Sequence, residues 1–170
     1  SYGAGMQDIW LIKTDSNGNE KWNRTFGGRY SDSSHSIVEM SDGGYLIGGS
    51  REFNINDFDI WIINLDINGK ERCNKTLPKP GNNFIESIIG SNDGGYMVIG
   101  GTKDQFMKKS IFLIKLNSSF MEERIPHPSP QNESWGNSIC QTSDGGYILT
   151  GYTTTNKKQD KVNKKKKTDS

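Results

Sequence analysis

The segment from Asp15 to Asn19 carries side-chain oxygens at alternate positions, in the order Asp15, Asn17 and Asn19. Alternating oxygen ligands of this kind begin the calcium-binding loop of an EF-hand. Gly18 comes too early for such a loop, however, and no bidentate glutamate follows at the required distance. Asn17-Gly18 is also a strong signal for a two-residue hairpin turn. We therefore predict a turn here. Asp15, Asn17 and Asn19 are the alternative candidates for metal ligands, and we expect no cofactor.

Two pairs of residues have side chains suited to catalysis: Glu20 with Glu71, and His35 with His127. A glycoside hydrolase needs two carboxylates facing each other across a cleft. Glu20 and Glu71 are 51 residues apart, and recurrence at that interval predicts equivalent solvent-facing positions on successive strands. His35 and His127 have no partner residues in a pattern that supports nucleophilic catalysis or zinc binding. We expect no catalytic residues and no enzymatic activity.

The stretch Ser-Asp-Gly-Gly-Tyr organises the chain. It occurs three times, with Asn for Ser in the second copy, at an interval of 51 residues: 41–45, 92–96 and 143–147. A fixed period of this size is typical of repeat architectures. Asp-Gly between two apolar runs predicts a type I′ hairpin turn, with positive φ at both central residues. Asp42, Asp93 and Asp144 would otherwise be metal ligands or acids, but we favour turn residues because Asp stabilises such turns locally.

Other segments recur at the same interval. Nearly continuous runs of β-branched and aromatic residues predict central strands buried on both faces; these runs are 8–15, 59–66 and 110–117. Segments 20–26 and 71–77 alternate apolar and polar residues, which predicts half-exposed edge strands. The third copy of that edge strand is degenerate and meets Pro126, where strand pairing should stop.

Each period therefore holds four short antiparallel strands, which is typical of a propeller blade. We predict an all-β fold with about three blades, as a partial or open propeller over residues 1–153; its parts are a part-blade 1–28, blades 35–77 and 86–125, and a part-blade 136–153. Propellers usually have about four to eight blades. An open arc would expose apolar faces, so we expect a fragment of a longer repeat protein or a ring closed by self-association.

Residues 154–170 depart from the repeat and contain the lysine run 164–167, although the net charge of the whole chain is only +1. Such a run predicts a solvated, disordered tail. Weak contact of this tail with nucleic acid or anionic lipid is a less favoured alternative, because no aromatic residues are interleaved for base stacking. The 170 residues contain no apolar run long enough for a membrane helix, and we expect no signal peptide among them.

Cysteine and asparagine usage bears on location and packing. Nothing in the spacing of Cys73 and Cys140 calls for a disulfide, and we expect both as small buried hydrophobic residues. Four N-glycosylation sequons favour an exported protein; they begin at Asn23, Asn74, Asn117 and Asn132.

Taken together, the anchors DIWLIKTD, NGN, TFGG and SDGGY at one period resemble the tandem propeller-type repeat of many microbial secreted and cell-surface proteins. The layout is similar to that of kelch and PQQ-like propeller repeats, and the resemblance covers residues 2–153. Trp61 lies further from the Gly-Gly pair than in kelch repeats, and no quinone-binding or metal-binding acids of PQQ enzymes can be placed. The resemblance implies an extracellular or cell-surface location, binding or display, and no catalysis.

The four strands of a blade are called inner, second, third and outer in chain order, and the inner strand of the first whole blade is 36–40. The loops that join outer to inner strands, and second to third strands, are expected on one rim of such a fold. They vary between copies, and variable loops on a fixed scaffold usually carry recognition. The candidate ligand-binding residues are Arg29, Tyr30, His35, Arg51, Phe53, Asn82, Asn83, Phe84 and Trp135.

Aromatic residues with Asn and Arg suit a protein or carbohydrate ligand. Phe84 and Trp135 would instead cap the interface between blades if they had only a structural role. We expect a non-enzymatic binding or display module. The alternatives are a fragment of a larger secreted carbohydrate-active or quinone-dependent propeller enzyme, and a simple spacer.

Overall fold

The computed structural model describes residues 5–126 and 132–154 of the chain. The predicted all-β architecture is confirmed, and the described residues contain no helix of the length and apolarity needed to cross a bilayer. The strands in this part of the chain are β1 (Ile9–Thr14), β2 (Glu20–Phe26), β3 (Asp32–Glu39), β4 (Tyr45–Asn54), β5 (Asp57–Leu65), β6 (Glu71–Leu77), β7 (Asn82–Gly90), β8 (Tyr96–Lys103), β9 (Lys109–Leu116), β10 (Glu122–Glu123), β11 (Ser134–Gln141) and β12 (Tyr147–Thr153).

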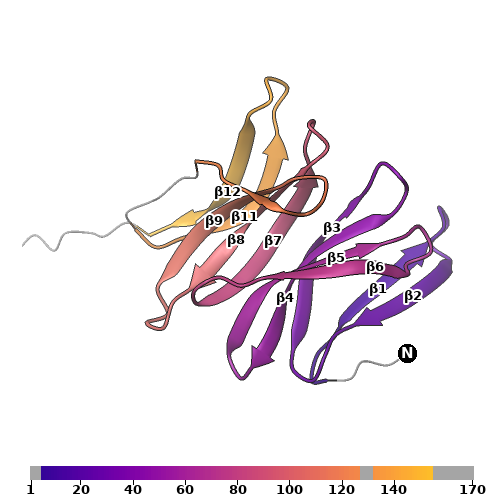
Figure 1. Cartoon of the computed structure of the whole chain (residues 1–170), viewed down its shortest axis with the longest axis horizontal. Coiled ribbons are helices and arrows are strands. Elements are labelled where there is room, and N and C mark those ends of the chain that lie inside the picture. Colours follow the sequence, from indigo (N-terminus) through magenta and orange to yellow (C-terminus); the bar gives the residue numbers. More distant parts are fainter. Residues whose placement is uncertain (1–4, 127–131, 155–170) are drawn as a thin grey trace, which may run out of the picture.

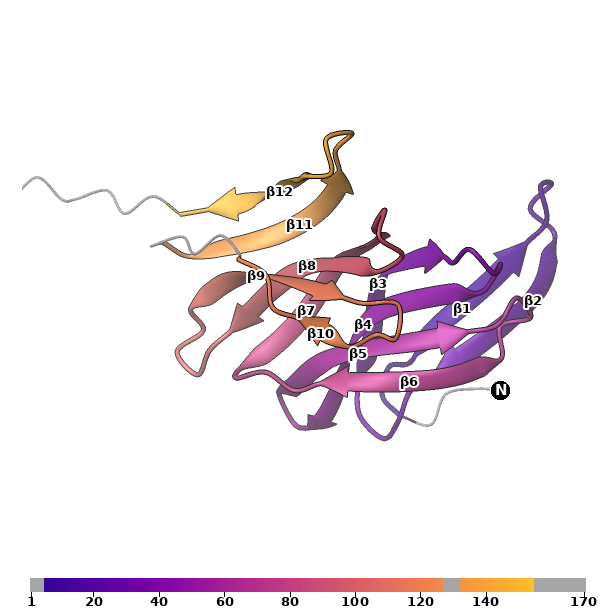
Figure 2. The ribbon, with the colours of Figure 1, turned by 45° about the horizontal axis from the view of Figure 1, so that its top comes forward.

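These strands form four antiparallel sheets in chain order. Two sheets have four strands, in the orders β3-β4-β5-β6 and β7-β8-β9-β10. Two-stranded sheets flank them, with β1-β2 at one end of the stack and β11-β12 at the other (Figure 1 and Figure 2). The described residues form an open stack and close neither a ring nor a barrel.

The 51-residue period of the sequence is also the period of the strand registers. Every residue pair between β1 and β2 recurs 51 positions later between β5 and β6. The pairing of β11 with β12 likewise repeats that of β3 with β4 and of β7 with β8. Even the irregularity is repeated, because one residue of each inner strand is left out of the ladder as a β-bulge: His35, Glu86 or Asn137.

The predicted type I′ turn is wrong. In the first Asp-Gly turn only Gly43 has positive φ, at 79°. The carbonyl of Met40 accepts the N–H of Gly43 at 2.9 Å, and the N–H of Met40 donates to the carbonyl of Gly44 at 2.8 Å. This is a three-residue loop in which a type I turn is followed by a left-handed glycine. One left-handed residue suffices there, which leaves the Asp42 carboxylate oriented to accept the N–H of Gly44 at 2.9 Å.

Apolar side chains fill the space between successive sheets. Between the two four-stranded sheets, Leu46 and Ile62 pack with Ile85 and Val98, all of them at most 2% exposed. Smaller clusters lie between β1-β2 and the first four-stranded sheet, and between the second one and β11-β12. The core is therefore divided into layers, each shared by two periods of the sequence.

Two sequence-based expectations about burial are wrong at the ends and edges of the stack. Residues 8–15 were expected to form a strand buried on both faces, but Trp10 is 66% and Ile12 is 42% exposed, because only one face of β1-β2 is covered. Cys73 and Cys140 are exposed free thiols. Cys73 lies on the edge strand β6, and Cys140 lies in the terminal two-stranded sheet, so both positions have a side in solvent.

Two further expectations concern the third period and the tail. Only the two residues of β10 pair at the degenerate edge strand before Pro126, as predicted. The lysine-rich tail lies outside the described residues except for Thr154, as does His127.

Replacing Leu46 by Ala should lower the free energy of unfolding by about 2 to 5 kcal/mol, because a fully buried leucine leaves a cavity between two sheets. Urea unfolding followed by tryptophan fluorescence measures this difference. Ile37, on the neighbouring strand β3, is 48% exposed and is the matched control. Ile37→Ala should cost less than about 1 kcal/mol, and equal losses for the two variants would contradict the layered core.

Candidate binding rim

Loops of different kinds lie at the two rims of the stack. The β2–β3, β4–β5, β6–β7 and β8–β9 connections lie on one rim, and the three Asp-Gly hairpins lie on the other (Figure 1). The first set contains the segments that vary between copies. We call this set of loops, together with the strand ends that carry them, the variable rim.

The variable rim contains a cleft of about 630 Å³ between the two four-stranded sheets. Its walls come from the β4–β5 hairpin, the β6–β7 loop and the β8–β9 hairpin. The lining residues are Asn56, Asp57, Lys79, Pro80, Gly81, Asn82, Thr102, Lys103, Asp104, Gln105, Phe106, Lys108 and Ser110. Of the nine residues predicted from the sequence, Asn82 alone belongs to this lining.

The hairpin tips beside this cleft expose large apolar side chains. In the β8–β9 hairpin, the Asp104 carboxylate accepts the N–H groups of Phe106 and Lys108 at 2.8 and 2.9 Å. The loop so fixed leaves Phe106 80% and Met107 64% exposed. On the facing β4–β5 hairpin, Ile55 is 80% exposed.

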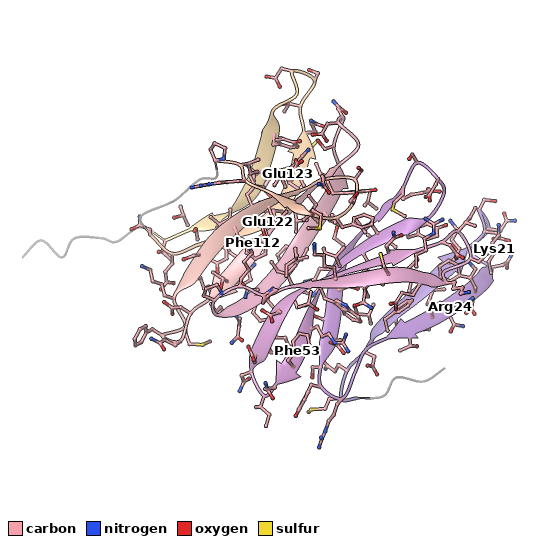
Figure 3. All side chains as sticks on the ribbon, viewed as in Figure 1. Lys21, Arg24, Phe53, Phe112, Glu122 and Glu123 are labelled. Atoms are coloured by element: carbon pink, nitrogen blue, oxygen red, sulfur yellow. The ribbon has the colours of Figure 1, made fainter. Side chains whose placement is uncertain are left out.

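Phe53 lies near the end of β4 on the same rim and is 42% exposed (Figure 3). Phe106 also belongs to the lining of the cleft, where most of the other residues have polar or charged side chains.

Charged side chains of both signs line the cleft: Lys79, Lys103, Lys108, Asp57 and Asp104. Lys79 pairs with Glu122 at 2.7 Å, and the ammonium of Lys103 lies 5.0 Å from the ring centre of Phe84. Lys103 and Lys108 form no ion pair within the described residues. The Asp104 carboxylate closes its own hairpin but keeps its charge, so the lining carries charges of both signs.

Two of the predicted aromatic residues lie between sheets. Phe58, Phe84 and Trp135 form a row with ring centres 5.3 and 6.0 Å apart. A Cβ atom on Gly101 would lie 2.2 Å from the Trp135 ring, so this glycine provides the space that the indole occupies. Phe84 and Trp135 are half-buried, and their packing is that of residues that join neighbouring sheets.

His35 and Trp135 are connected through a residue that the sequence analysis missed. His35 Nδ1 lies 3.3 Å from Glu86 Oε2, and the indole N–H of Trp135 donates to Glu86 Oε1 at 2.9 Å. Glu86 occupies the bulge position that corresponds to His35 one period earlier. That equivalence was visible in the sequence as a difference of 51 residues between two polar positions.

Arg51 and Asn83 make internal contacts. The Arg51 guanidinium lies 4.7 Å from the ring centre of Trp61 and 5.5 Å from that of Phe53. The amide of Asn83, which is 1% exposed, donates to the carbonyls of Lys79 and Gly81 at 3.0 and 2.7 Å and so fixes the β6–β7 loop. Neither side chain points its polar group into the cleft between the sheets.

Arg29 and Tyr30 lie apart from that cleft, in the β2–β3 loop. The guanidinium of Arg29 lies 5.8 Å from the ring centre of Tyr30. The variable rim thus separates the predicted residues into local groups.

Asp32 is a buried carboxylate at the position equivalent to Asn83. It is 3% exposed, and its Oδ2 accepts the N–H of Gly28 at 2.6 Å. Its Oδ1 lies 3.9 Å from Arg51 Nε and has no hydrogen-bond partner within the described residues. Asp8 Oδ1 also lacks a hydrogen-bond partner there. Burial raises the pKa of Asp32, against the opposing effects of the Gly28 N–H and of Arg51.

The candidate metal ligands of the sequence analysis serve in turns. Asp15 Oδ1 accepts the N–H groups of Asn17 and Asn19 at 2.8 and 3.0 Å. The bond from the Asn19 side-chain amide to Asp15 Oδ2, together with these two backbone bonds, lowers the pKa of Asp15. The neutral Asn117 closes its own loop with the same pair of backbone bonds. Residues 15–19 thus form a hairpin, as predicted, but with a three-residue loop instead of the two-residue turn, because Gly18 is left-handed and Asn17 is not. Residues 5–126 and 132–154 contain no group of three or more His, Cys, Asp or Glu that could hold a metal ion.

The recurrent aspartates of the Asp-Gly hairpins also serve their turns. In each copy the carboxylate accepts the N–H of the second glycine. Asp42 additionally pairs with Arg72, and Asp93 pairs with the buried Lys115. Glu20 and Glu71, considered above as catalytic acids, are exposed and each accept a bond from the Asn three residues later.

Comparison with protein-family models and with curated proteins gave no match for this chain. The resemblance to kelch-like and PQQ-like repeats therefore stays a prediction.

Asp32→Asn should raise the free energy of unfolding by about 1 kcal/mol at neutral pH, because the amide replaces an unpaired buried oxygen by a donor, as in Asn83. A raised folded-state pKa stabilises the folded chain only while the carboxyl holds its proton, so the stabilising effect of Asn should shrink toward about pH 4. Urea unfolding at both pH values measures this. A variant less stable than the parent at neutral pH would contradict it.

The contact with Lys115, with help from the Gly95 N–H, lowers the pKa of Asp93 from 3.8 to about 2. The stability from this contact is present above about pH 4 and is lost as the pH falls toward 2. Carbon-detected NMR titration should report that value for Asp93. In Lys115→Met the pKa should move toward 3.8, and an unchanged value would assign the shift to the turn alone.

Proposed function

We propose that the chain is a propeller-type repeat array of the kind found in microbial secreted and cell-surface proteins, with kelch-like and PQQ-like layout. Two four-stranded antiparallel sheets with a common 51-residue period support this proposal. So do the shared bulges and the Asp-Gly hairpins on one rim. An extracellular or surface location is the expected setting, supported by the exposed sequon residues Asn23 and Asn74.

On this scaffold the function that we propose is non-enzymatic binding of a protein ligand. The observation that carries the proposal is the cleft between three variable loops, with exposed Ile55, Phe106 and Met107 at its hairpin tips. Aromatic residues and methionine are enriched in protein interfaces. Exposed side chains of this size on neighbouring loops are costly to leave in water, so burial against a partner would stabilise a complex.

A protein ligand fits the variable rim better than a carbohydrate ligand does. Phe84 and Trp135 pack against each other, and the Lys103 ammonium lies 5.0 and 5.7 Å from their ring centres. Their faces are thus occupied by neighbours instead of being presented as a platform for a sugar ring. The exposed rim residue Phe106 stands on a hairpin tip, where it would enter a pocket of a partner.

The charged side chains of the variable rim indicate which class of protein ligand it would bind. Lys103 and Lys108 line the cleft beside Asp57 and Asp104, and neither lysine forms an ion pair in the described part of the chain. Their ammonium groups are therefore free to bind carboxylates of a ligand. An acidic segment that also carries apolar side chains would complement both features. We therefore propose an acidic, partly apolar peptide segment of a protein as the ligand class.

Selection of a displayed random-peptide library against the whole chain should enrich peptides that combine Asp or Glu with aromatic or aliphatic residues. For a selected peptide, Phe106→Ala should weaken binding at least about tenfold, since loss of a central aromatic contact costs roughly 1 to 2 kcal/mol. Lys108→Ala should weaken binding at low salt and have a smaller effect at high salt. Fluorescence anisotropy measures both.

Ile67→Ala is the matched control, because Ile67 is 57% exposed on the β5–β6 turn at the opposite rim. Its affinity should equal that of the parent chain, and circular dichroism should show all three variants folded. Selected peptides that bind Phe106→Ala and Lys108→Ala as tightly as the parent would contradict the proposed site.

A further inference from the structure

The two ends of the stack expose apolar side chains whose counterparts inside the stack are buried. On β1, Trp10 is 66% exposed, whereas Trp61, 51 positions later on β5, is 3% exposed. On β12, Ile148 is 60% exposed, whereas its counterpart Met97 on β8 is 1% exposed. The same repeat positions are thus covered in the middle of the stack and uncovered at its ends.

Each end also lacks a neighbouring strand. Inside the stack, β4 lies between β3 and β5, and β8 lies between β7 and β9. Their counterpart β12 pairs, in the described part of the chain, with β11 alone. At the other end, β1 is the counterpart of β5 and β9 but pairs with β2 alone within residues 5–126 and 132–154. The free edge of β12 therefore lacks a neighbour equivalent to β1, and the free edge of β1 lacks a neighbour equivalent to β12.

We propose that β12 of one copy of this chain pairs antiparallel with β1 of a second copy. The strands β11, β12, β1 and β2 then form one four-stranded sheet with the order of β3-β4-β5-β6. Within one chain these strands lie at opposite ends of the stack, with two four-stranded sheets between them (Figure 1 and Figure 2). In this arrangement β1 does not lie beside β12 of its own copy, and we assign the partner strand to a second copy.

The complete sheets determine the register of this pairing. Tyr45 faces Leu65 in the first sheet, and the corresponding pair in the second sheet is again 51 residues later. The same shift places Tyr147 of one copy opposite Thr14 of the next copy. Every side chain then falls on the face that its counterparts occupy, as it must when residues alternate between faces.

A glycine opposite an aromatic residue fits the two edges together. In the second sheet Gly100 faces Phe112, and a Cβ atom on Gly100 would lie 2.8 Å from the end of the phenyl ring. The ring thus uses the space above the glycine. In the proposed pairing Gly151 lies opposite Trp10, so the exposed indole would find the same space on β12.

The composition of the edges points to the same two strands. Outer edge strands usually carry charges that discourage pairing with another chain. The outer strands β2, β6 and β10 each carry at least two charged residues, whereas β12 has none and β1 has only Lys13. The two strands that lack a second neighbour in the described chain thus also carry fewer charged residues than the outer strands do.

Light scattering behind a sizing column tests this proposal on the whole chain. The parent should show a mass above 19.0 kDa that rises with concentration. Trp10→Lys and Ile148→Lys place a charge on one edge each, at exposed positions where folding does not need the original side chain. Each variant alone should run as a 19.0 kDa monomer.

Mixing the two variants distinguishes this contact from a symmetric one. Trp10→Lys keeps β12 intact, and Ile148→Lys keeps β1 intact, so an equimolar mixture should form a one-to-one dimer and nothing larger. A symmetric dimer through either edge would instead persist in one of the variants alone. Ile55→Lys, at an 80% exposed position on a hairpin tip, is the control and should assemble like the parent.

Disulfide formation tests the register. In a chain with Cys73→Ser and Cys140→Ser, Thr150→Cys and Leu11→Cys are directly opposed and should cross-link neighbouring copies. The pair Thr150→Cys and Ile12→Cys is one residue out of register and should not cross-link, because the two thiols point to opposite faces of the sheet. A parent chain of 19.0 kDa at all concentrations, or assembly that survives in both lysine variants, would overturn the proposal.

Discussion

Hydrophobic burial between facing sheets is the constraint on which the rest of the structure depends. A single period of this chain has no second layer of its own, so its apolar face must be covered by the next period. Leu46 and Ile62 from one sheet meet Ile85 and Val98 from the next. A Cβ atom on Gly48 would lie only 3.0 Å from a methyl group of Ile85, so backbone and side chain are already in contact there.

The hydrogen-bonding pattern of the loops follows from that stacking. Sheets that face one another at a constant interval need hairpins of constant shape. The side chains of Asp15, Asp66 and Asn117 close three equivalent hairpins with the same backbone bonds, whether or not they carry a charge. The loops on the variable rim are under less constraint, since they need only return the chain to the next strand.

The sequence predicted strands, edges and repeats well because their signals are local and occur several times. Burial at the ends was mispredicted, because the sequence of β1 resembles that of β5 although only the latter has a sheet on each side. Trp10 is exposed and Trp61 is buried because their sheets have different neighbours in the stack. No local sequence pattern contains that information. The turn type was mispredicted because a single left-handed glycine already closes the loop.

The candidate site was less predictable than the fold. Position on a loop indicated which rim varies, but did not say which side chains face a shared space. Asn83 looked like an available amide, yet its donors are used by the carbonyls of Lys79 and Gly81. Conversely, Lys103 and Lys108 line the cleft and were not predicted, because isolated surface lysines carry no distinguishing signal in a sequence.

The bulges on the inner strands have a consequence for how such a chain can diversify. At His35, Glu86 and Asn137 the backbone leaves one residue out of the ladder, so its side chain is not held by a partner on the adjacent strand. One geometric position thus holds an imidazole, a carboxylate and an amide in successive periods. Substitution there changes the side-chain chemistry beside β3, β7 or β11 while the ladder stays intact. Each period of the repeat therefore contains one position at which the polar side chain can differ without loss of strand pairing.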